Sequence, residues 1–250
     1  MTSDQGYAKA SFRSQVRVEE PATRWIWGWR DWATVAIIPS LFLIAWALRA
    51  LPPLTVGFVD TAVRCAFFAL LVVLNAAMLG RHWAAFWSAK WRGIGLVLLG
   101  GVVIQVVISG TRALLTALGH DSTGTVDDSS IQPGLVALLF LSLNPVVTAL
   151  LEDFTFRHTL LMKLPVWRNA AVAALAVIVN ALLFGALHIN NFGGDWLSTL
   201  IFAAAGLVMN LVYLWTRNIW HVLLMHGINN LVLAGPLTVL LVWVLQQAVG

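Results

Sequence analysis

Long apolar runs separated by short polar stretches dominate this sequence. Most of the runs approach the roughly 20 residues that an α-helix needs to cross a bilayer. We prefer a count of about eight helices. A count of about seven is the alternative, because the last two runs are short and the fourth carries charges. The pattern predicts an all-α, polytopic integral membrane bundle of about eight transmembrane helices, at residues 33–51, 62–79, 93–118, 135–164, 170–188, 197–215, 218–234 and 236–249.

Composition agrees with a membrane protein. Hydrophobic residues make up 60% of the chain and charged residues 10%, with a mean hydropathy of +0.84, which lies outside the range of soluble domains. Residues 1–32 are polar, contain Pro21 and lack a signal-peptide core, so they predict a cytoplasmic tail and an interfacial segment. Residues 33–250 are predicted to form a single transmembrane domain.

Basic residues divide unequally between the two predicted sides. Lys and Arg near helix ends favour the cytoplasmic side of a membrane. With the N-terminus inside, 12 of the 15 basic residues fall on inner segments, and the exceptions are Arg49, Arg64 and Arg112. We therefore predict a multi-pass protein of a lipid bilayer, in a prokaryotic cytoplasmic membrane, with a cytoplasmic N-terminus. The net charge of +4 then reflects topology, and nucleic acid is not an expected partner.

Polar residues in the fourth apolar run carry the first candidate chemistry. A charge at the centre of a membrane helix costs about 3 kcal/mol, so it indicates a partner, a cavity or a function. Asn144-Pro145 interrupts the run and predicts a kink. Asp153 and Arg157 lie four residues apart and predict an internal ion pair. Glu152 points about 100° away from Asp153, and an unpaired carboxylate in an apolar setting has the character of a general base. The alternative is that residues 151–158 form the cytoplasmic end of the span.

Two later apolar runs also carry polar residues. His188 ends one run and is a candidate catalytic residue. The alternative is that it is an interfacial hydrogen-bonding residue, as a lone histidine at a helix end often is. His226 and Asn230 lie four apart and present two polar groups on one helix face, with Gly227 allowing close approach of another helix. The alternative for this pair is a polar contact that holds helices together. No role is assigned to four histidines in or near predicted loops: His82, His120, His158 and His221.

Three short motifs occur in order along the chain: Glu152-Asp153-x-x-x-Arg157, Phe184-x-x-x-His188 and His226-x-x-x-Asn230. Together they resemble the CAAX protease and bacteriocin-processing family of intramembrane endopeptidases, also called the CPBP or Abi family. The resemblance covers about residues 145–233. Where that family usually has a second Glu, this chain has Asp153, which can pair with Arg157 through its shorter side chain.

The resemblance implies a glutamate-type endopeptidase that cleaves a membrane-associated protein or peptide. Glu152 and His188 would activate a water molecule for attack on the peptide carbonyl. His226 and Asn230 would donate hydrogen bonds to the resulting oxyanion, and Asp153 with Arg157 would support the site. No cofactor is expected.

Two other interpretations remain open. One Glu and two His are also the ligand set of a hydrolytic zinc site that leaves a position for water, although the chain has no His-Glu-x-x-His motif. A membrane scaffold or transporter subunit would use the same polar groups to join helices or line a pore. The sequence lacks the internal repeats that are typical of transporters.

The depth of the motif residues is a separate expectation. At about 1.5 Å per residue, Glu152 lies about 18 Å and His188 about 27 Å from the inner ends of their helices. Helix tilt can bring these two together. His226, at about 12 Å, reaches them only if its helix is broken or begins deeper in the membrane.

Overall fold

The computed structural model describes residues 11–122 and 133–249, and all regular structure in these residues is helical. The fold class predicted from the apolar runs is confirmed. Most of the segment between the third and fourth predicted spans, residues 119–134, lies outside the described residues. The helices are α1 (Phe12–Val16), α2 (Trp29–Leu48), α3 (Pro53–Leu74), α4 (Ala76–Ser88), α5 (Lys90–Ala117), α6 (Leu135–Leu141), α7 (Leu143–Glu152), η1 (Asp153–Leu161), α8 (Ala170–Ala186), η2 (Ile189–Phe192), α9 (Leu200–Thr216), α10 (Ile219–Leu233) and α11 (Pro236–Val249).

Five described stretches are long and apolar enough to cross a membrane: Trp29–Leu48, Pro53–Leu74, Lys90–Ala117, Leu135–Leu161 and Ile219–Ala248. Two further apolar helices, α8 and α9, have 17 residues each, which corresponds to about 26 Å of helix. The last two predicted spans become α10 and α11, which together form one of the five long stretches. Each predicted apolar run therefore coincides with helix.

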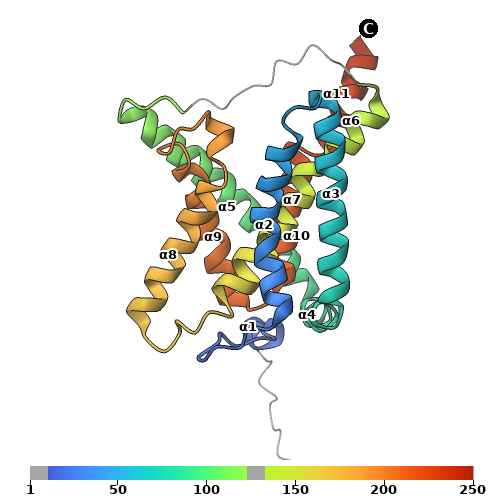
Figure 1. Ribbon diagram of the computed structural model, residues 1–250. Helices are drawn as coiled ribbons and strands as arrows, with labels where there is room; N and C mark the ends of the chain where they lie inside the picture. Colours follow the sequence, from blue (N-terminus) through green and yellow to red (C-terminus); the bar gives the residue numbers. More distant parts are fainter. Residues whose placement is uncertain (1–10, 123–132, 250) are drawn as a thin grey trace, which may run out of the picture.

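The helices form two groups that face each other (Figure 1). One group contains α5, α8 and α9, and the other contains α2, α3 and α7. Helix α10 packs against both α5 and α7 and joins the groups. Residues 11–28 and α4 lie at one end of the bundle, which we call the base. The far end, called the open end, contains η2 and the last turns of α2 and α10.

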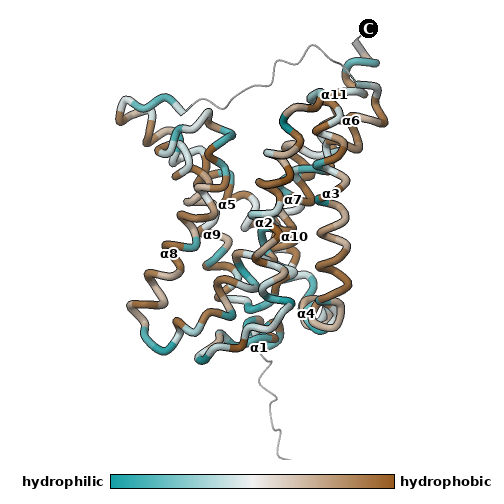
Figure 2. Tube along the Cα trace, in the orientation of Figure 1, coloured by the Kyte–Doolittle hydropathy of each residue, from teal (hydrophilic) through white to brown (hydrophobic). Residues whose placement is uncertain are grey.

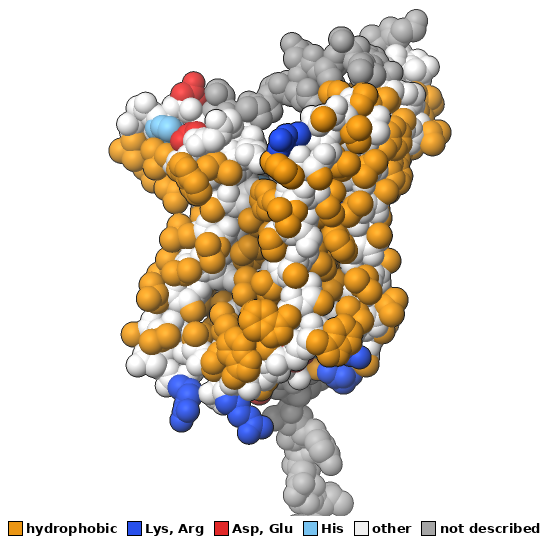
Figure 3. All heavy atoms as spheres, in the orientation of Figure 1, with side chains coloured by type: hydrophobic (Ala, Val, Ile, Leu, Met, Phe, Trp, Pro, Cys, Tyr) orange, Lys and Arg blue, Asp and Glu red, His pale blue; other side chains and the backbone are white. Residues whose placement is uncertain are grey.

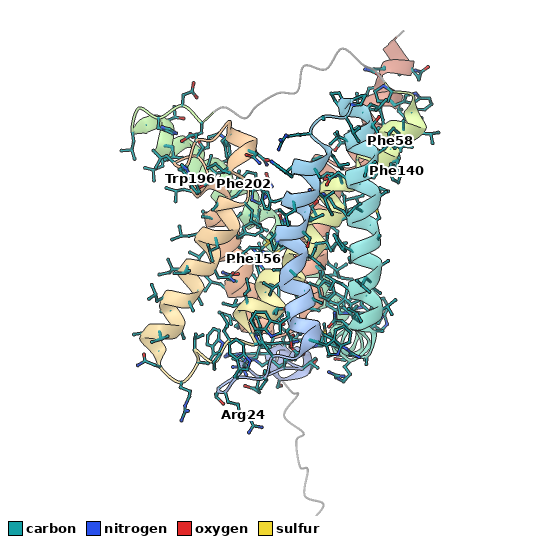
Figure 4. All side chains as sticks on the ribbon, viewed as in Figure 1. Arg24, Phe58, Phe140, Phe156, Trp196 and Phe202 are labelled. Carbon is teal, nitrogen blue, oxygen red and sulfur yellow. The ribbon has the colours of Figure 1, made fainter. Side chains whose placement is uncertain are left out.

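Hydropathy along the chain matches this arrangement. Figure 2 shows hydrophobic residues along the long helices and hydrophilic residues gathered at the two ends. The flanks of the molecule are covered by apolar side chains, as a lipid-facing surface requires (Figure 3). Phe58 of α3 and Phe140 of α6 stack with ring centroids 5.5 Å apart near the open end (Figure 4).

The N-terminal segment packs against the base and covers the start of α10. Asn218, which caps that helix, is fully buried. Its side-chain amide donates to the carbonyl oxygens of Val16 and His82, at 3.2 and 2.8 Å. Helix α10 therefore begins inside the protein rather than at its surface. The depth of this start in the membrane, on which the reach of His226 was expected to depend, stays a prediction.

A carboxylate of the same segment enters the base between two histidines. Glu19 Oε1 lies 3.3 Å from His82 Nε2, and Glu19 Oε2 lies 3.3 Å from His158 Nδ1. The hydroxyl of Tyr213 lies 3.2 Å from the same His158 nitrogen. Burial alone would raise the pKa of the Glu19 carboxyl, but hydrogen bonding with His158 and His82 holds it well below its usual range. We call these four residues the Glu19 cluster.

The Glu19 cluster corrects the sequence-based view of the histidines. His82, His158 and His221 are buried inside the protein and do not lie in loops. His120 does lie in a loop, at the open end, where its Nε2 is 2.6 Å from Asp195 Oδ2. A hydrogen bond from Ser198 and a further bond with His120 lower the pKa of Asp195 to about 2, although burial acts in the opposite direction. These contacts tie the end of α5 to the segment between η2 and α9.

The fourth apolar run divides into three helical parts. The break falls at Ser142, and Pro145 lies in the first turn of α7, where its missing N–H costs little. The kink expected at Asn144-Pro145 is therefore displaced toward the N-terminus. After Glu152 the chain continues as a π-helix, η1, in which the Met162 amide donates to the Arg157 carbonyl five residues earlier. Such π turns occur frequently at functional sites.

Close helix packing precedes His188. A Cβ atom at Gly185 would lie 2.6 Å from the Thr199 carbonyl oxygen and 2.7 Å from the Ala203 Cβ, so only glycine fits where α8 meets α9. At Gly227 a Cβ would make an ordinary 3.4 Å contact with Leu150. The close approach expected at Gly227 therefore occurs at Gly185 instead, and it fixes the helix that presents His188.

Candidate active site

A cavity of about 450 Å³ lies between α2, α3, α7, α10 and η2. One wall is apolar and comes mainly from α2, with Ile38, Leu41, Phe42 and Ala45. The other wall is polar and contains Glu152, His188 and Asn230 together with Arg64, Asn144, Thr148, Asn190 and Asn191. Three of the four residues predicted to be catalytic therefore border a single space.

Glu152 is the last residue of α7, immediately before the π-helix. Its side chain borders the cavity, and the residue is 5% exposed. None of the described residues donates a hydrogen bond to its carboxylate, whereas the neighbouring Asp153 is enclosed with Arg157 and His226. The two adjacent carboxylates therefore have different surroundings, and Glu152 is the one that can meet a water molecule.

His188 follows α8 and is held in one orientation. Its Nδ1 lies 3.0 Å from the carbonyl oxygen of Phe184, and its ring stacks on Phe202 at 4.1 Å. A carbonyl oxygen only accepts hydrogen bonds, so Nδ1 carries the proton. In the neutral ring, Nε2 is then an acceptor that can bind a water proton or a metal ion. Figure 4 shows Phe202 on the side of the cavity formed by α9.

Asp153, Arg157 and His226 form a buried charged group behind the cavity wall. Arg157 Nη1 lies 3.4 Å from Asp153 Oδ1, and both residues are fully buried. Asp153 Oδ2 lies 3.5 Å from His226 Nδ1. The Arg157 guanidinium also lies over the ring of Phe184, 4.1 Å from its centroid, in a cation–π contact. The contact predicted by the spacing of Asp153 and Arg157 is present, and Asp153 also faces His226.

Asn230 belongs to a chain of three side-chain amides. Its Nδ2 donates to the Pro145 carbonyl at 2.9 Å, and its Oδ1 accepts from Asn229 Nδ2 at 3.1 Å. Asn229 Oδ1 in turn accepts from Gln105 Nε2 at 2.7 Å. Because a carbonyl cannot donate, Pro145 fixes the direction of every bond in the chain. Asn230 therefore keeps one N–H for Pro145 and has a second N–H to offer to a ligand in the cavity.

A second polar group lines the cavity from α3. Arg64 Nε binds Asp60 and Arg64 Nη1 binds Thr148 Oγ1, each at 2.8 Å. Asn144 Nδ2 donates to the same Asp60 oxygen at 2.7 Å. Asn144, Thr148 and Glu152 lie at four-residue intervals and share one face of α7. The polar wall of the cavity therefore runs two helical turns beyond Glu152.

The structure thus separates the predicted site residues into two sets. Glu152, His188 and Asn230 border the cavity. His226 lies one turn before Asn230 on α10 and contacts Asp153 and Phe184 instead. Sequence reasoning missed Arg64, Gln105 and the amide chain. Arg64 carried a signal, because it is a basic residue inside an apolar run and falls on the side predicted to be non-cytoplasmic. The side chains described contain no group of three or more His, Cys, Asp or Glu residues that could hold a metal ion.

Residues 134–232 match the family model described as type II CAAX prenyl endopeptidase Rce1-like. The match includes all three motifs and confirms the family resemblance. This part of the chain is therefore similar to a family of membrane proteases. No curated protein and no solved structure matches the chain significantly.

Proposed function

We propose that this chain, whose residues 134–232 carry the Rce1-like CAAX endopeptidase region, is a glutamate-type intramembrane endopeptidase. It hydrolyses a peptide bond of a membrane-associated protein or peptide without a cofactor. The observation that carries the proposal is the shared cavity, in which Glu152, His188 and Asn230 from three different helical segments border one space.

Glu152 and His188 activate the attacking water molecule. The Glu152 carboxylate accepts a proton from water, and His188 Nε2 accepts the second hydrogen bond that orients this water. Both groups are suited to these roles. None of the described residues donates a hydrogen bond to the Glu152 carboxylate, and the Phe184 carbonyl accepts from His188 Nδ1, which leaves His188 Nε2 as the acceptor. The apolar wall of α2 lowers the local polarity beside the reacting carbonyl, which strengthens electrostatic interactions there.

Asn230 and His226 serve as oxyanion donors. The amide chain leaves an N–H of Asn230 for the developing negative charge on the carbonyl oxygen. His226 Nδ1 faces Asp153 Oδ2 at 3.5 Å, which leaves Nε2 as the ring nitrogen for the oxyanion. Asp153 and Arg157 therefore support the site rather than touch the substrate.

Replacement of Glu152 by Gln tests this function. Gln keeps the size of the side chain but exchanges one acceptor oxygen for an NH₂ donor and cannot accept a proton, so we expect hydrolysis to fall by about 10²–10⁴-fold or more. Comparison of the membrane peptides of a Glu152→Gln strain and the wild type identifies the uncleaved substrate. The purified variants are then assayed on that peptide in detergent, with the exposed Glu20→Gln as the matched control.

The same assay separates the alternatives. The double variant Glu152→Gln/His188→Ala should be scarcely slower than either single variant, because residues that act on one water molecule are not additive. Full activity of Glu152→Gln would contradict the role of Glu152 as the base, and the absence of hydrolysis by the wild type as well would favour a scaffold. Loss of activity with a chelator and its recovery with zinc would instead favour a zinc-dependent hydrolase.

A further inference from the structure

The cavity is exposed at the open end of the bundle. Ala45, Asn190 and Ala234 line it, and all three are exposed. They lie near the end of α2, within η2 and just after α10, respectively. The rim is therefore built from segments that meet at this end, opposite residues 11–28 (Figure 1).

The base below the cavity is sealed by packed side chains. Arg157, Tyr213 and Asn218 are fully buried between the cavity and the N-terminal segment. Val16 and Glu19 of that segment fill the remaining space through the contacts with Asn218 and with the two histidines. A substrate therefore has a route to Glu152 from the open end, while the route from the base is filled.

The two ends carry different charges. The open end has Arg49 and Arg112, together with Asp121 and Asp195. Figure 3 shows several Lys and Arg side chains at the base, and Asp and His together with one Lys or Arg group at the opposite end, and Figure 4 marks Arg24 at the base. Ten basic residues lie on segments of the base: Arg13, Arg17, Arg24, Arg30, Arg81, Lys90, Arg92, Lys163, Arg168 and Arg217. This excess orients the base toward the cytoplasm.

We infer that the active site is entered from the non-cytoplasmic face, and that its substrate is an exported peptide or the outer juxtamembrane segment of a membrane-anchored protein. The inference rests on the proposed endopeptidase function. It follows from two independent observations, the position of the cavity rim and the distribution of basic residues.

The cavity walls indicate which form of such a substrate binds. An extended segment presents free backbone N–H and C=O groups, and the amides of Asn144, Asn190 and Asn230 line one wall. The opposite wall of α2 is apolar and suits hydrophobic side chains next to a membrane anchor. The substrate is therefore an unfolded stretch at the outer membrane surface rather than a folded domain.

Cysteine labelling in intact cells tests the access side without an activity assay. The single native cysteine, Cys65, is first replaced by Ala. Asn190→Cys then reports the cavity rim and Arg24→Cys reports the base. Trp196→Cys and Arg168→Cys, also exposed, are second reporters for the two ends. Labelling after detergent denaturation measures the total thiol.

A membrane-impermeant maleimide should label Asn190→Cys and Trp196→Cys in intact cells at least tenfold more than Arg24→Cys and Arg168→Cys. The base reporters should react only after permeabilisation. Preferential labelling of the base, equal labelling of both ends, or rim reporters that react only after permeabilisation would overturn the inference.

Substrate location provides the second arm. The peptide that accumulates in the Glu152→Gln strain should be digested by protease added to intact cells, and its protection would overturn the inference. If no peptide accumulates, the proposed function fails, whereas the labelling result still decides which face the cavity opens to.

Discussion

The base and the cavity each contain a carboxylate beside histidine, but the two groups have opposite surroundings. At the base, Glu19 lies between His82 and His158, within packed side chains. In the cavity, Glu152 has no hydrogen-bond donor among the described residues and faces open space beside His188. The same residue types therefore hold an element in place where carboxylate and histidine are paired with each other, and can perform chemistry where the carboxylate is left unpaired beside a cavity.

Arg157→Ala should give the largest effect and tests whether the buried charges behind the cavity are structural. The change leaves Asp153 buried without its guanidinium partner, which costs about 3–5 kcal/mol in comparable buried pairs. We expect a strong loss of folded protein and a lower melting temperature in detergent, measured by size-exclusion chromatography and thermal unfolding.

The exposed Arg81→Ala is the matched control and should change stability by less than about 0.5 kcal/mol. An Arg157→Ala protein that melts like the wild type but is inactive would instead mean that Arg157 acts on the substrate. That result would move Arg157 from the structural group to the catalytic one.

Asn230→Ala sharpens the comparison within the cavity itself. Removal of one oxyanion donor should lower kcat by about 10²-fold with little change in KM, since His226 remains. Gln105→Leu breaks only the far end of the amide chain and should lower kcat by about fivefold, corresponding to about 1 kcal/mol. Equal kcat values for Gln105→Leu and the wild type would show that the chain does not orient Asn230.

Glu19→Gln should give the smallest effect and should be visible in stability before activity. Loss of the charged hydrogen bonds costs about 1.5 kcal/mol. Because the folded-state pKa of Glu19 is lowered, its contribution is complete above its unfolded pKa, about 4.3, and is lost as the pH falls further toward the folded value. The difference in melting temperature between wild type and variant should therefore be constant above about pH 5 and shrink below about pH 4.

A difference that grows in acid would contradict this assignment of charge to the Glu19 cluster. The exposed Glu20→Gln, in the same segment, serves as the control and should show no such dependence.

The transmembrane helices and the motif residues could be predicted from the sequence because both depend on local patterns. Apolar runs of the right length specify spans by themselves, and the spacing of Asp153 and Arg157 placed them in contact. The three motifs likewise indicated that Glu152, His188 and Asn230 would be neighbours, and they do border one cavity. Their catalytic roles stay predictions.

The remaining features depend on partners far apart in the chain. Residues 1–32 read as a polar tail because nothing nearby indicates that Glu19 meets His82 and His158. Gln105 and Asn229 are 124 residues apart, and neither stands out alone. The π-helix also has no local signature, since its hydrogen bonds form only when tertiary packing selects them over the α pattern.

The π-helix makes the length of this segment as important as its side chains. Each i to i+5 turn contains one residue more than an α-helical turn. The π-helix η1 therefore accommodates more residues than an α-helix of the same number of turns. Deletion of one residue between Thr155 and Leu161 would remove one surplus residue, so that one π turn could become an α turn with the following chain still in place, whereas insertion of a residue would turn everything after it by about 100°. A substitution in this stretch changes single contacts, whereas an inserted residue would rotate every side chain that follows it.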